Sequence, residues 1–394
     1  MNKKILDEAV QRYIDSNLNA DVAKIALAKS PFEGISSAEI VIQINSKKKS
    51  QKKLLTWFKT ASIYYPATLS IEQTSSEITA KYKSELAKGD SLIDITGGFG
   101  VDDYYFAKKV KNLTHCEINE DLSYIAEYNA AVLGTKNINF LPVDGIEYLR
   151  SASENFDTIF VDPARRSEIG KVFMLKDCTP DVAANLDMLL TKANRIIVKT
   201  APLLDIKAGF SELKNVSEVH IVSLKNECKE LLWVIDRDFK GITKFVAVTL
   251  NDAEKQFVFR QDEMDVNADY ANDISDSDYL YEPDAALLKS GAFNLIGSKY
   301  GLKKLHPQTQ LYTSAIFKPE FAGRIFKIDE IISTGVLKKS TDLTGNIIVR
   351  NYPAKPEDLS KKHKIKPSKN QFVIFTKDNM GNNIVLKTTI LQYY

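Results

Sequence analysis

A glycine-rich segment is the part of this sequence best suited to binding a ligand. It reads DITGGFGVDD over residues 94–103, follows an apolar stretch and precedes a stretch with helical character. Gly98 and Gly100 lack the Cβ atoms that would keep a ligand away from the backbone. A carboxylate at Asp94 can attract the cationic end of a cofactor. The sequence predicts a cofactor-binding turn, and a tight turn without a ligand is the alternative. The residues assigned to this turn are Asp94, Thr96, Gly97, Gly98 and Gly100.

Two more acids follow the ends of the next two apolar stretches. Glu117 comes 23 residues after Asp94, where doubly wound α/β folds place an acid that accepts hydrogen bonds from ribose hydroxyls. Asp144, in PVDGIEYL, ends the third stretch and can hold the amino group of an adenine. Each acid alone is better explained as a helix cap or a solvated turn residue. Together, at consecutive strand ends, they predict a cofactor that contains adenosine.

A fourth apolar stretch ends in FVDPARRS, residues 160–167. A carboxylate at Asp162 and the backbone of Pro163 can accept hydrogen bonds from an amine and orient its lone pair toward an electrophile. The two arginines that follow indicate contact with phosphate, or ion pairs with nearby carboxylates. Lys199, which ends the fifth stretch in IIVKTAP, contacts substrate or caps the sheet. We assign Asp162, Pro163 and Arg165 to catalysis, and Arg166 and Lys199 to substrate binding.

Seven short β-rich stretches alternate with helical ones, which is typical of parallel strands joined by crossover helices. They lie near residues 92, 114, 138, 158, 195, 218 and 231. About seven residues separate the last two, too few for a crossover, so we expect a hairpin. One antiparallel strand should therefore end the sheet, whereas a dinucleotide-binding dehydrogenase normally finishes with another parallel unit. The expected fold class is α/β, with a seven-stranded Rossmann-like sheet, an N-terminal helical region and a small C-terminal α+β module.

The rest of the chain divides into two regions. Residues 1–60 have apolar residues at helical spacing and include a basic run, KKKSQKK, which either contacts phosphates or is a solvated helix face. Residues 261–279 carry seven acids and no base, which is typical of a loop or linker. Helical stretches and alternating strands follow and predict the C-terminal module.

These motifs resemble the class I S-adenosylmethionine-dependent methyltransferases, especially those that modify exocyclic amines of bases. The matching loop in that class reads Asp or Asn, Pro, Pro and an aromatic residue. Asp162 and Pro163 match, whereas Ala164 and Arg165 do not, so the usual stacking of a flipped base is not indicated. Thr96 replaces the first glycine of the common Asp-x-Gly-x-Gly-x-Gly pattern, as in the subset that acts on nucleic-acid amino groups.

That subset tends to use an element upstream of the first strand. Residues 70–86 can serve this role, with Gln73 and Thr74 turned toward the methionine end of the cofactor. The alternative is a capping box formed by Thr74 and Glu77 that only starts a helix.

More closely, DITGGFGVD, FVDPARR, IIVKTAP, YEPDAALLKSGAF and RNYP together resemble bacterial methyltransferases with a C-terminal THUMP-like domain, over about residues 70–394. The resemblance implies S-adenosylmethionine as cofactor and, by analogy with true THUMP domains, an RNA target. The expected divisions are an N-terminal helical region (1–60), a class I methyltransferase domain (61–240), a linker with a small ferredoxin-like or helical region (241–322) and a THUMP-like α+β domain (323–394).

Basic side chains gather near the C-terminus. Between residues 350 and 369 seven lysines and arginines face only two acids. This cluster predicts salt-dependent phosphate binding, with Tyr352 available to stack on an unpaired base, and a plain solvated surface is the alternative. We assign Arg350, Tyr352 and Lys362 to substrate binding.

Composition sets broad limits. The 394 residues, 44% of them hydrophobic, suffice for two or three domains, and a net charge of +2 gives no global attraction to polyanions. Three cysteines without a C-x-x-C pair, and no stretch long enough to span a membrane, lead us to expect a cytoplasmic protein without a membrane partner. The four histidines lack ligand spacing, so no metal is expected. The oligomeric state is open.

We therefore expect an enzyme, an S-adenosylmethionine-dependent methyltransferase that modifies a base nitrogen of RNA, either tRNA or rRNA. Three alternatives stay open. The enzyme methylates a protein or small molecule, the protein binds RNA without catalysis, or it is a nicotinamide-dependent oxidoreductase.

Overall fold

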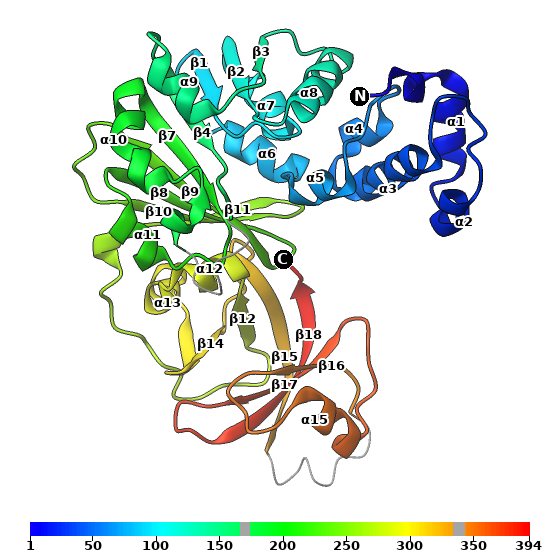
Figure 1. Cartoon of the computed structure of the whole chain (residues 1–394). Helices are drawn as coiled ribbons and strands as arrows, with labels where there is room; N and C mark the ends of the chain where they lie inside the picture. Colours follow the sequence, from blue (N-terminus) through cyan, green and yellow to red (C-terminus); the bar gives the residue numbers. More distant parts are fainter. Residues whose placement is uncertain (166–173, 334–342) are drawn as a thin grey trace. The chain divides into compact units, whose positions relative to one another are not determined.

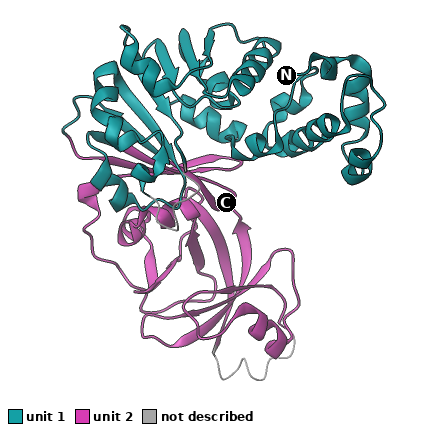
Figure 2. Ribbon diagram, viewed as in Figure 1, with its two compact units in different colours: residues 1–217, 232–240 teal, residues 218–231, 241–394 magenta. Residues whose placement is uncertain are grey.

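The structure is a computed structural model that describes residues 1–165, 174–333 and 343–394 (Figure 1). The chain forms two compact units. The first contains residues 1–217 and 232–240, and the second contains residues 218–231 and 241–394 (Figure 2). The finer four-part division expected from the sequence remains a prediction.

Helices begin the first unit, as the apolar spacing predicts. They are η1 (Lys3–Leu6), α1 (Glu8–Ser16), α2 (Val22–Leu27), α3 (Ser37–Lys53), α4 (Leu55–Lys59), α5 (Thr68–Gln73) and α6 (Glu77–Ser84). Helix α3 starts with a capping box, in which the side chains of Ser36 and Glu39 each accept a hydrogen bond from the other residue's backbone amide. Ile40, Ile44 and Trp57 are buried in one hydrophobic cluster of this region, which anchors the helices.

The basic run in α3 is largely engaged within the helical region. Lys47 is buried and forms an ion pair with Asp15, and Lys49 forms one with Glu72. The Nζ atom of Lys53 donates hydrogen bonds to two backbone carbonyls at the end of α5, at 3.0 and 2.7 Å. Three of the run's lysines therefore hold α3 to its neighbours, which favours a structural role.

All seven strands predicted from the sequence are present. They are β1 (Ser91–Asp94), β2 (Asn112–Cys116), β3 (Ile138–Leu141), β4 (Phe156–Val161), β7 (Ala193–Thr200), β8 (Val216–Leu224) and β9 (Glu227–Asp236). The helices between them are α7 (Val101–Phe106), α8 (Glu120–Val132), α9 (Gly145–Ser151), α10 (Val182–Lys192) and α11 (Ile206–Glu212). Strand β1 pairs in parallel with β2 and β4, β2 with β3, and β4 with β7. Their carboxyl ends therefore share one edge of the sheet.

The predicted hairpin is present, but its expected place at the end of the sheet is wrong. Only Lys225 and Asn226 join β8 to β9, and their φ angles of 53° and 60° are those of a type I′ turn. The strand order is β11-β10-β8-β9-β7-β4-β1-β2-β3, so the sheet has nine strands rather than seven. The two additional strands are β10 (Lys244–Leu250), parallel to β8, and β11 (Glu254–Arg260), antiparallel to β10. Because nearly every residue of β10 is buried, it lacks the alternation that would have revealed it.

A second sheet, of seven strands, lies in the second unit. Its order is β13-β14-β12-β15-β18-β17-β16. The strands are β12 (Tyr279–Pro283), β13 (Lys303–His306), β14 (Thr309–Ser314), β15 (Gly323–Ser333), β16 (Asn346–Val349), β17 (Gln371–Lys377) and β18 (Asn383–Gln392). Among the described residues, the helices of this unit are α12 (Ala285–Ser290), α13 (Phe293–Tyr300) and α15 (Pro356–His363). Leu280, Phe326 and Ile374 are fully buried in its core, and both helices and strands contribute to this unit.

The remaining short elements are β5 (Ala164–Arg165), η2 (Leu175–Asp177), β6 (Cys178–Thr179) and η3 (Gln261–Glu263). After η3 the acidic segment has no helix or strand until β12, as predicted. Across the described ranges, no helix has the length and apolar character needed to cross a bilayer.

Candidate active site and cofactor site

The glycine-rich turn follows β1 directly, and its glycines serve different purposes. Gly98 and Gly100 have φ angles of 57° and 77°, which other residue types rarely adopt. Gly97 is required for space, because a Cβ atom there would lie 2.2 Å from the ring of His115. The segment thus forms a tight turn between β1 and α7, and one of its glycines accommodates a buried side chain. The contact of these residues with a cofactor remains a prediction.

The side chain of Asp94 stabilises this turn by hydrogen bonding. It is only 1% exposed, and its Oδ1 atom accepts hydrogen bonds from the backbone amide and the Oγ1 hydroxyl of Thr96, at 2.7 and 3.1 Å. Burial, together with the neighbouring charge of Asp103, raises the pKa of Asp94 well above its usual value. The geometry gives Asp94 a role in shaping the turn. Its contact with the cationic end of a cofactor remains a prediction.

A buried pair beneath the turn escaped the sequence analysis. The Nδ1 atom of His115 lies 2.5 Å from Oδ2 of Asp103, and both side chains are fully buried. Burial lowers the pKa of His115 to about 4, so its ring is neutral at physiological pH. Burial also raises the pKa of Asp103, with the nearby charge of Asp102 as the second cause. No sequence spacing shows this pair, because it depends on helix α7, which carries Asp103, packing against β2, which carries His115.

The segment before β1 that contains Gln73 and Thr74 is hydrogen-bonded to α7, the helix after the glycine turn. Gln73 ends α5 and is exposed, and Thr74 follows it. The hydroxyl of Ser75 donates a 2.7 Å hydrogen bond to Asp102 in α7, and Lys83 lies 2.8 Å from the same hydroxyl and 3.1 Å from Asp102. This network places Gln73 and Thr74 near the start of α7, and their contact with a cofactor remains a prediction.

The capping box that we considered for Thr74 and Glu77 is wrong. Ser76 is the N-cap of α6, and its hydroxyl accepts the backbone amide of Thr79. The carboxylate of Glu77 instead accepts a 2.9 Å hydrogen bond from the Tyr105 hydroxyl. The helix therefore starts two residues later than that alternative required.

The acids after β2 and β3 lie at the same edge of the sheet as the turn. Glu117 accepts backbone amides of Gly98 and Asn119 through its two oxygens, at 2.9 and 2.8 Å. Asp144 is exposed and caps α9 through Oδ1, which accepts two backbone amides. Because each carboxylate oxygen has two lone pairs, both acids retain acceptor capacity for ribose hydroxyls and an adenine amino group.

Asp162 lies just beyond β4 and has two fixed contacts. Its backbone amide donates a 2.7 Å hydrogen bond to Oγ1 of Thr96, and its carboxylate forms an ion pair with Lys199 in β7. The Asp162 side chain is 32% exposed and that of Lys199 is 15% exposed. Pro163 is buried. Arg165 belongs to β5, which pairs with β6, and Arg166 lies outside the described residues.

The substrate-binding residues predicted near the C-terminus differ in their surroundings. Arg350 donates two hydrogen bonds to Oε1 of the buried Glu282, at 3.0 and 2.7 Å. The ring of Tyr352 packs edge-on against Phe375, with 5.3 Å between centroids. Lys362 is exposed in the last turn of α15. Arg350 and Tyr352 are therefore held within the second unit, while Lys362 faces solvent.

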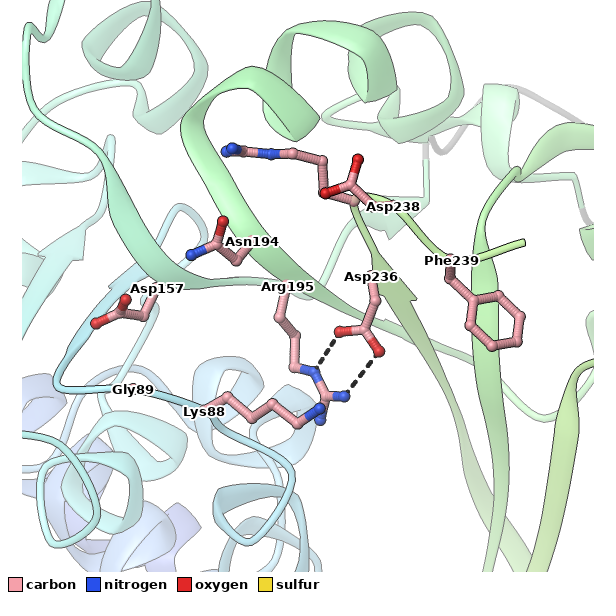
Figure 3. Close-up of a pocket in the computed structure, with 9 residues that line it drawn as sticks. Lys88, Gly89, Asp157, Asn194, Arg195, Asp236, Asp238 and Phe239 are labelled. Carbon is pink, nitrogen blue, oxygen red and sulfur yellow. Dashed lines mark hydrogen bonds and ion pairs between the residues drawn. The ribbon is translucent and has the colours of Figure 1, made fainter. Parts of the chain in front are cut away.

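Figure 3 shows a pocket of about 560 Å³ in the first unit that is separate from this site. Gly89 precedes β1, Asp157 is the second residue of β4 and Arg195 is the third of β7, so the pocket lies at the amino ends of the parallel strands. The guanidinium of Arg195 donates two 2.8 Å hydrogen bonds to the carboxylate of Asp236, drawn as dashed lines. The cofactor turn lies at the opposite, carboxyl ends. Within the described ranges, no group of three or more histidine, cysteine or acidic side chains is arranged to hold a metal ion.

A parallel sheet with an antiparallel strand between β7 and β8, a glycine turn after β1 and acids after β2 and β3 define a class I methyltransferase fold. Family models match the C-terminal part of the chain. Residues 279–321 match a ferredoxin-like domain and residues 323–389 match a THUMP-like domain.

The chain is similar to several known proteins. A crystal structure of a "putative methyltransferase" from Porphyromonas gingivalis W83 is 31% identical, with a TM-score of 0.88 and coverage of 99% of both chains. An "uncharacterized S-adenosylmethionine-dependent methyltransferase" of Mycobacterium tuberculosis is 21% identical over 79% of this chain and 84% of that protein. An "uncharacterized RNA methyltransferase" of Mycoplasma mobile is 32% identical over 159 residues, 36% of this chain, and the match spans 43% of that protein's length.

The chain belongs to the methyltransferase family of the Porphyromonas gingivalis protein. It is an S-adenosylmethionine-dependent methyltransferase with a THUMP-like domain. The residues present fit this cofactor, because the turn leaves room at Gly98, where an added Cβ would meet only the Thr96 carbonyl at 3.8 Å, and two acids follow the adjacent strands.

Proposed function

We propose that this protein transfers a methyl group from S-adenosylmethionine to a nitrogen of an RNA base, in tRNA or rRNA. The observation that carries the proposal is the placement of Asp162, beside the cofactor turn and fixed by Thr96 and Lys199. The bound cofactor supplies an electrophilic methyl group on its sulfonium. The protein's task is to bind, orient and exclude water around the two reactants.

In this proposal the cofactor lies along the carboxyl edge of the sheet. Glu117 accepts the ribose hydroxyls and Asp144 accepts the adenine amino group. The backbone of residues 96–100 lies against the cofactor, and Gln73 and Thr74 face its methionine end. The exposed Asp144, the half-buried Glu117 and the glycine turn support this arrangement.

The ion pair between Asp162 and Lys199 supports a neutral amine as the target. Oδ2 of Asp162 is paired with Lys199, and we assign Oδ1 and the backbone of Pro163 as acceptors for the two hydrogens of an exocyclic amine. A protonated protein amine would instead meet the nearby charge of Lys199, which already neutralises the carboxylate. A base amine needs only hydrogen-bond acceptors and is uncharged. The site therefore suits a base better than a lysine side chain.

The second unit supports RNA as the substrate. Lys361, Lys362, Lys364, Lys366 and Lys369 are all exposed, within and just after α15. Such a cluster attracts phosphates in a salt-dependent manner. The THUMP-like match covers these residues, and the Mycoplasma mobile relative carries the name of an RNA methyltransferase.

The direct test uses methyl-labelled S-adenosylmethionine with a pool of unmodified tRNA and rRNA transcripts. Label that is lost on ribonuclease treatment, and that Asp162→Ala reduces at least tenfold, would support the proposal. Label lost on protease treatment would assign a protein target. RNA binding without any transfer would leave a noncatalytic RNA-binding protein. Calorimetric titration with the cofactor, its demethylated product and NADH runs in parallel, and binding of NADH alone would contradict the proposed chemistry.

The role of the basic cluster has a separate test. Lys362→Gln should weaken RNA binding and lower the slope of log affinity against log salt by about 0.7 to 0.9, the value of one phosphate contact. Lys303→Gln, an exposed lysine of the same unit outside the cluster, is the matched control and should change neither quantity. Equal effects of both substitutions would indicate only a general charge effect.

A further inference from the structure

The side-chain hydroxyl of Thr96 connects the cofactor turn to Asp162, which directly follows β4. Oγ1 of Thr96 accepts the backbone amide of Asp162 at 2.7 Å and lies 3.1 Å from Oδ1 of Asp94. An amide can only donate, so the hydroxyl accepts at Asp162, and its own hydrogen points to the carboxyl oxygen of Asp94. The direction of both hydrogen bonds is therefore fixed by chemistry.

The Thr96 hydroxyl replaces the backbone carbonyl that would otherwise accept the amide of Asp162. Strands β1 and β4 pair in parallel, and the amide of Ile95 donates to the carbonyl of Phe160 at 3.1 Å just beyond the last paired residues. The chain after β1 then bends into the glycine turn. The amide of Asp162 lies past this point, and the Thr96 side chain accepts it instead of a strand carbonyl. A glycine at position 96, as in the common pattern of this fold, has no atom that can make this bond.

The same hydroxyl is part of a longer polar chain across four strand ends. His115 of β2 contacts Asp103 of α7, Asp94 ends β1, and Asp162 after β4 pairs with Lys199 of β7. Thr96 is the connection between the cofactor half and the substrate half of this chain.

We propose that Thr96 is a positioning residue for methyl transfer, whose hydroxyl fixes Asp162 relative to the cofactor turn. This inference rests on the role of Asp162 in the proposed function. Transfer rates are sensitive to shifts of about 1 Å in reacting groups, so a loosened Asp162 slows transfer even when the cofactor binds normally. Thr96 itself need not contact the substrate.

The test compares Thr96→Val, which keeps the shape without the hydroxyl, with Thr96→Ser, which keeps the hydroxyl. The first measurement is amide hydrogen exchange of Asp162 in the full chain without ligand. The second is the Kd for S-adenosylmethionine by calorimetry. The third is kcat and KM on the transcript pool described above.

We expect Thr96→Val to lower the protection of the Asp162 amide and kcat about tenfold each, equivalent to about 1.4 kcal/mol, with a cofactor Kd within about threefold of the original. Thr96→Ser should retain the protection of the Asp162 amide and kcat within about threefold of the original values. Unchanged Asp162 protection in Thr96→Val would overturn the inference, whether or not a transcript is methylated. So would a parallel loss of cofactor affinity and kcat, which indicates a merely structural role.

The two proposals fail in different ways. If Asp162→Ala transfers methyl groups at the original rate, the role of Asp162 in the proposed function is wrong. If Asp162→Ala is inactive while Thr96→Val is fully active, only the positioning role of Thr96 is wrong.

Discussion

Replacing Gly97 by alanine tests whether the glycine turn is shaped by the buried histidine beneath it. The added Cβ would lie 2.2 Å from the ring of His115, about 1.3 Å inside the contact distance of about 3.5 Å between carbon atoms. The ring cannot swing away freely, because it is fully buried and Asp103 contacts Nδ1 at 2.5 Å. Either the ring or the turn must move.

Forcing a methyl group into a packed interior costs about 1 to 3 kcal/mol. We therefore expect Gly97→Ala to lower the free energy of unfolding of the first unit by about 2 kcal/mol. Any strain taken up by the turn should also weaken cofactor binding. The backbone at Gly97 is not left-handed, so the loss is steric and not conformational.

Urea unfolding followed by tryptophan fluorescence measures this loss cleanly. The chain has two tryptophans, Trp57 and Trp233, and both belong to the first unit. The control is a double-mutant cycle with His115→Ala, in which removal of the ring should recover most of the Gly97→Ala loss. An unchanged unfolding midpoint for Gly97→Ala, or the same loss with and without the ring, would refute the reasoning.

Two further predictions concern ion pairs in the second unit. Glu282→Ala removes a carboxylate that is only 5% exposed and pairs with two arginines, so the free energy of unfolding of this unit should fall by about 3 to 4 kcal/mol. Arg350→Ala changes a side chain that is 48% exposed and should lower it by about 1 kcal/mol or less. Hydrogen exchange of the β12 and β15 amides reports both values, and equal losses would contradict this ranking. The hydrogen bond from His220 lowers the pKa of Glu218 to about 2 from 4.5, so its stabilisation is complete above about pH 4.5 and is lost as the pH falls toward 2. Unfolding free energies measured from pH 6 to pH 2 should show this loss in the original protein and less of it in Glu218→Gln, and identical profiles would count against the assignment.

Much of the fold was predictable because its signals are local. Alternating β-rich and helical stretches located all seven expected strands, and the short connection at Lys225 and Asn226 required a hairpin. The two added strands were missed for different reasons. Strand β10 is covered on both faces and shows no alternation. Strand β11 falls within residues 241–322, which were assigned to a linker with a small ferredoxin-like or helical region.

The site was predictable in part. The glycine turn and the acids after β2 and β3 were located, since parallel strands bring their carboxyl ends to one edge. The partners of those residues were not. Arg350 was expected to bind substrate, yet it pairs with Glu282, 68 positions earlier in the chain.

The sequence by itself determined the class of fold, the turn and the family resemblance, because these depend on residue type and spacing over short segments. Only the tertiary structure decided that His115 lies beneath Gly97, that Thr96 holds the amide of Asp162, and that Lys199 pairs with its carboxylate. Asp162 is 66 residues from Thr96 and 37 from Lys199. Contacts over such separations are set by the register of paired strands, which no local pattern specifies.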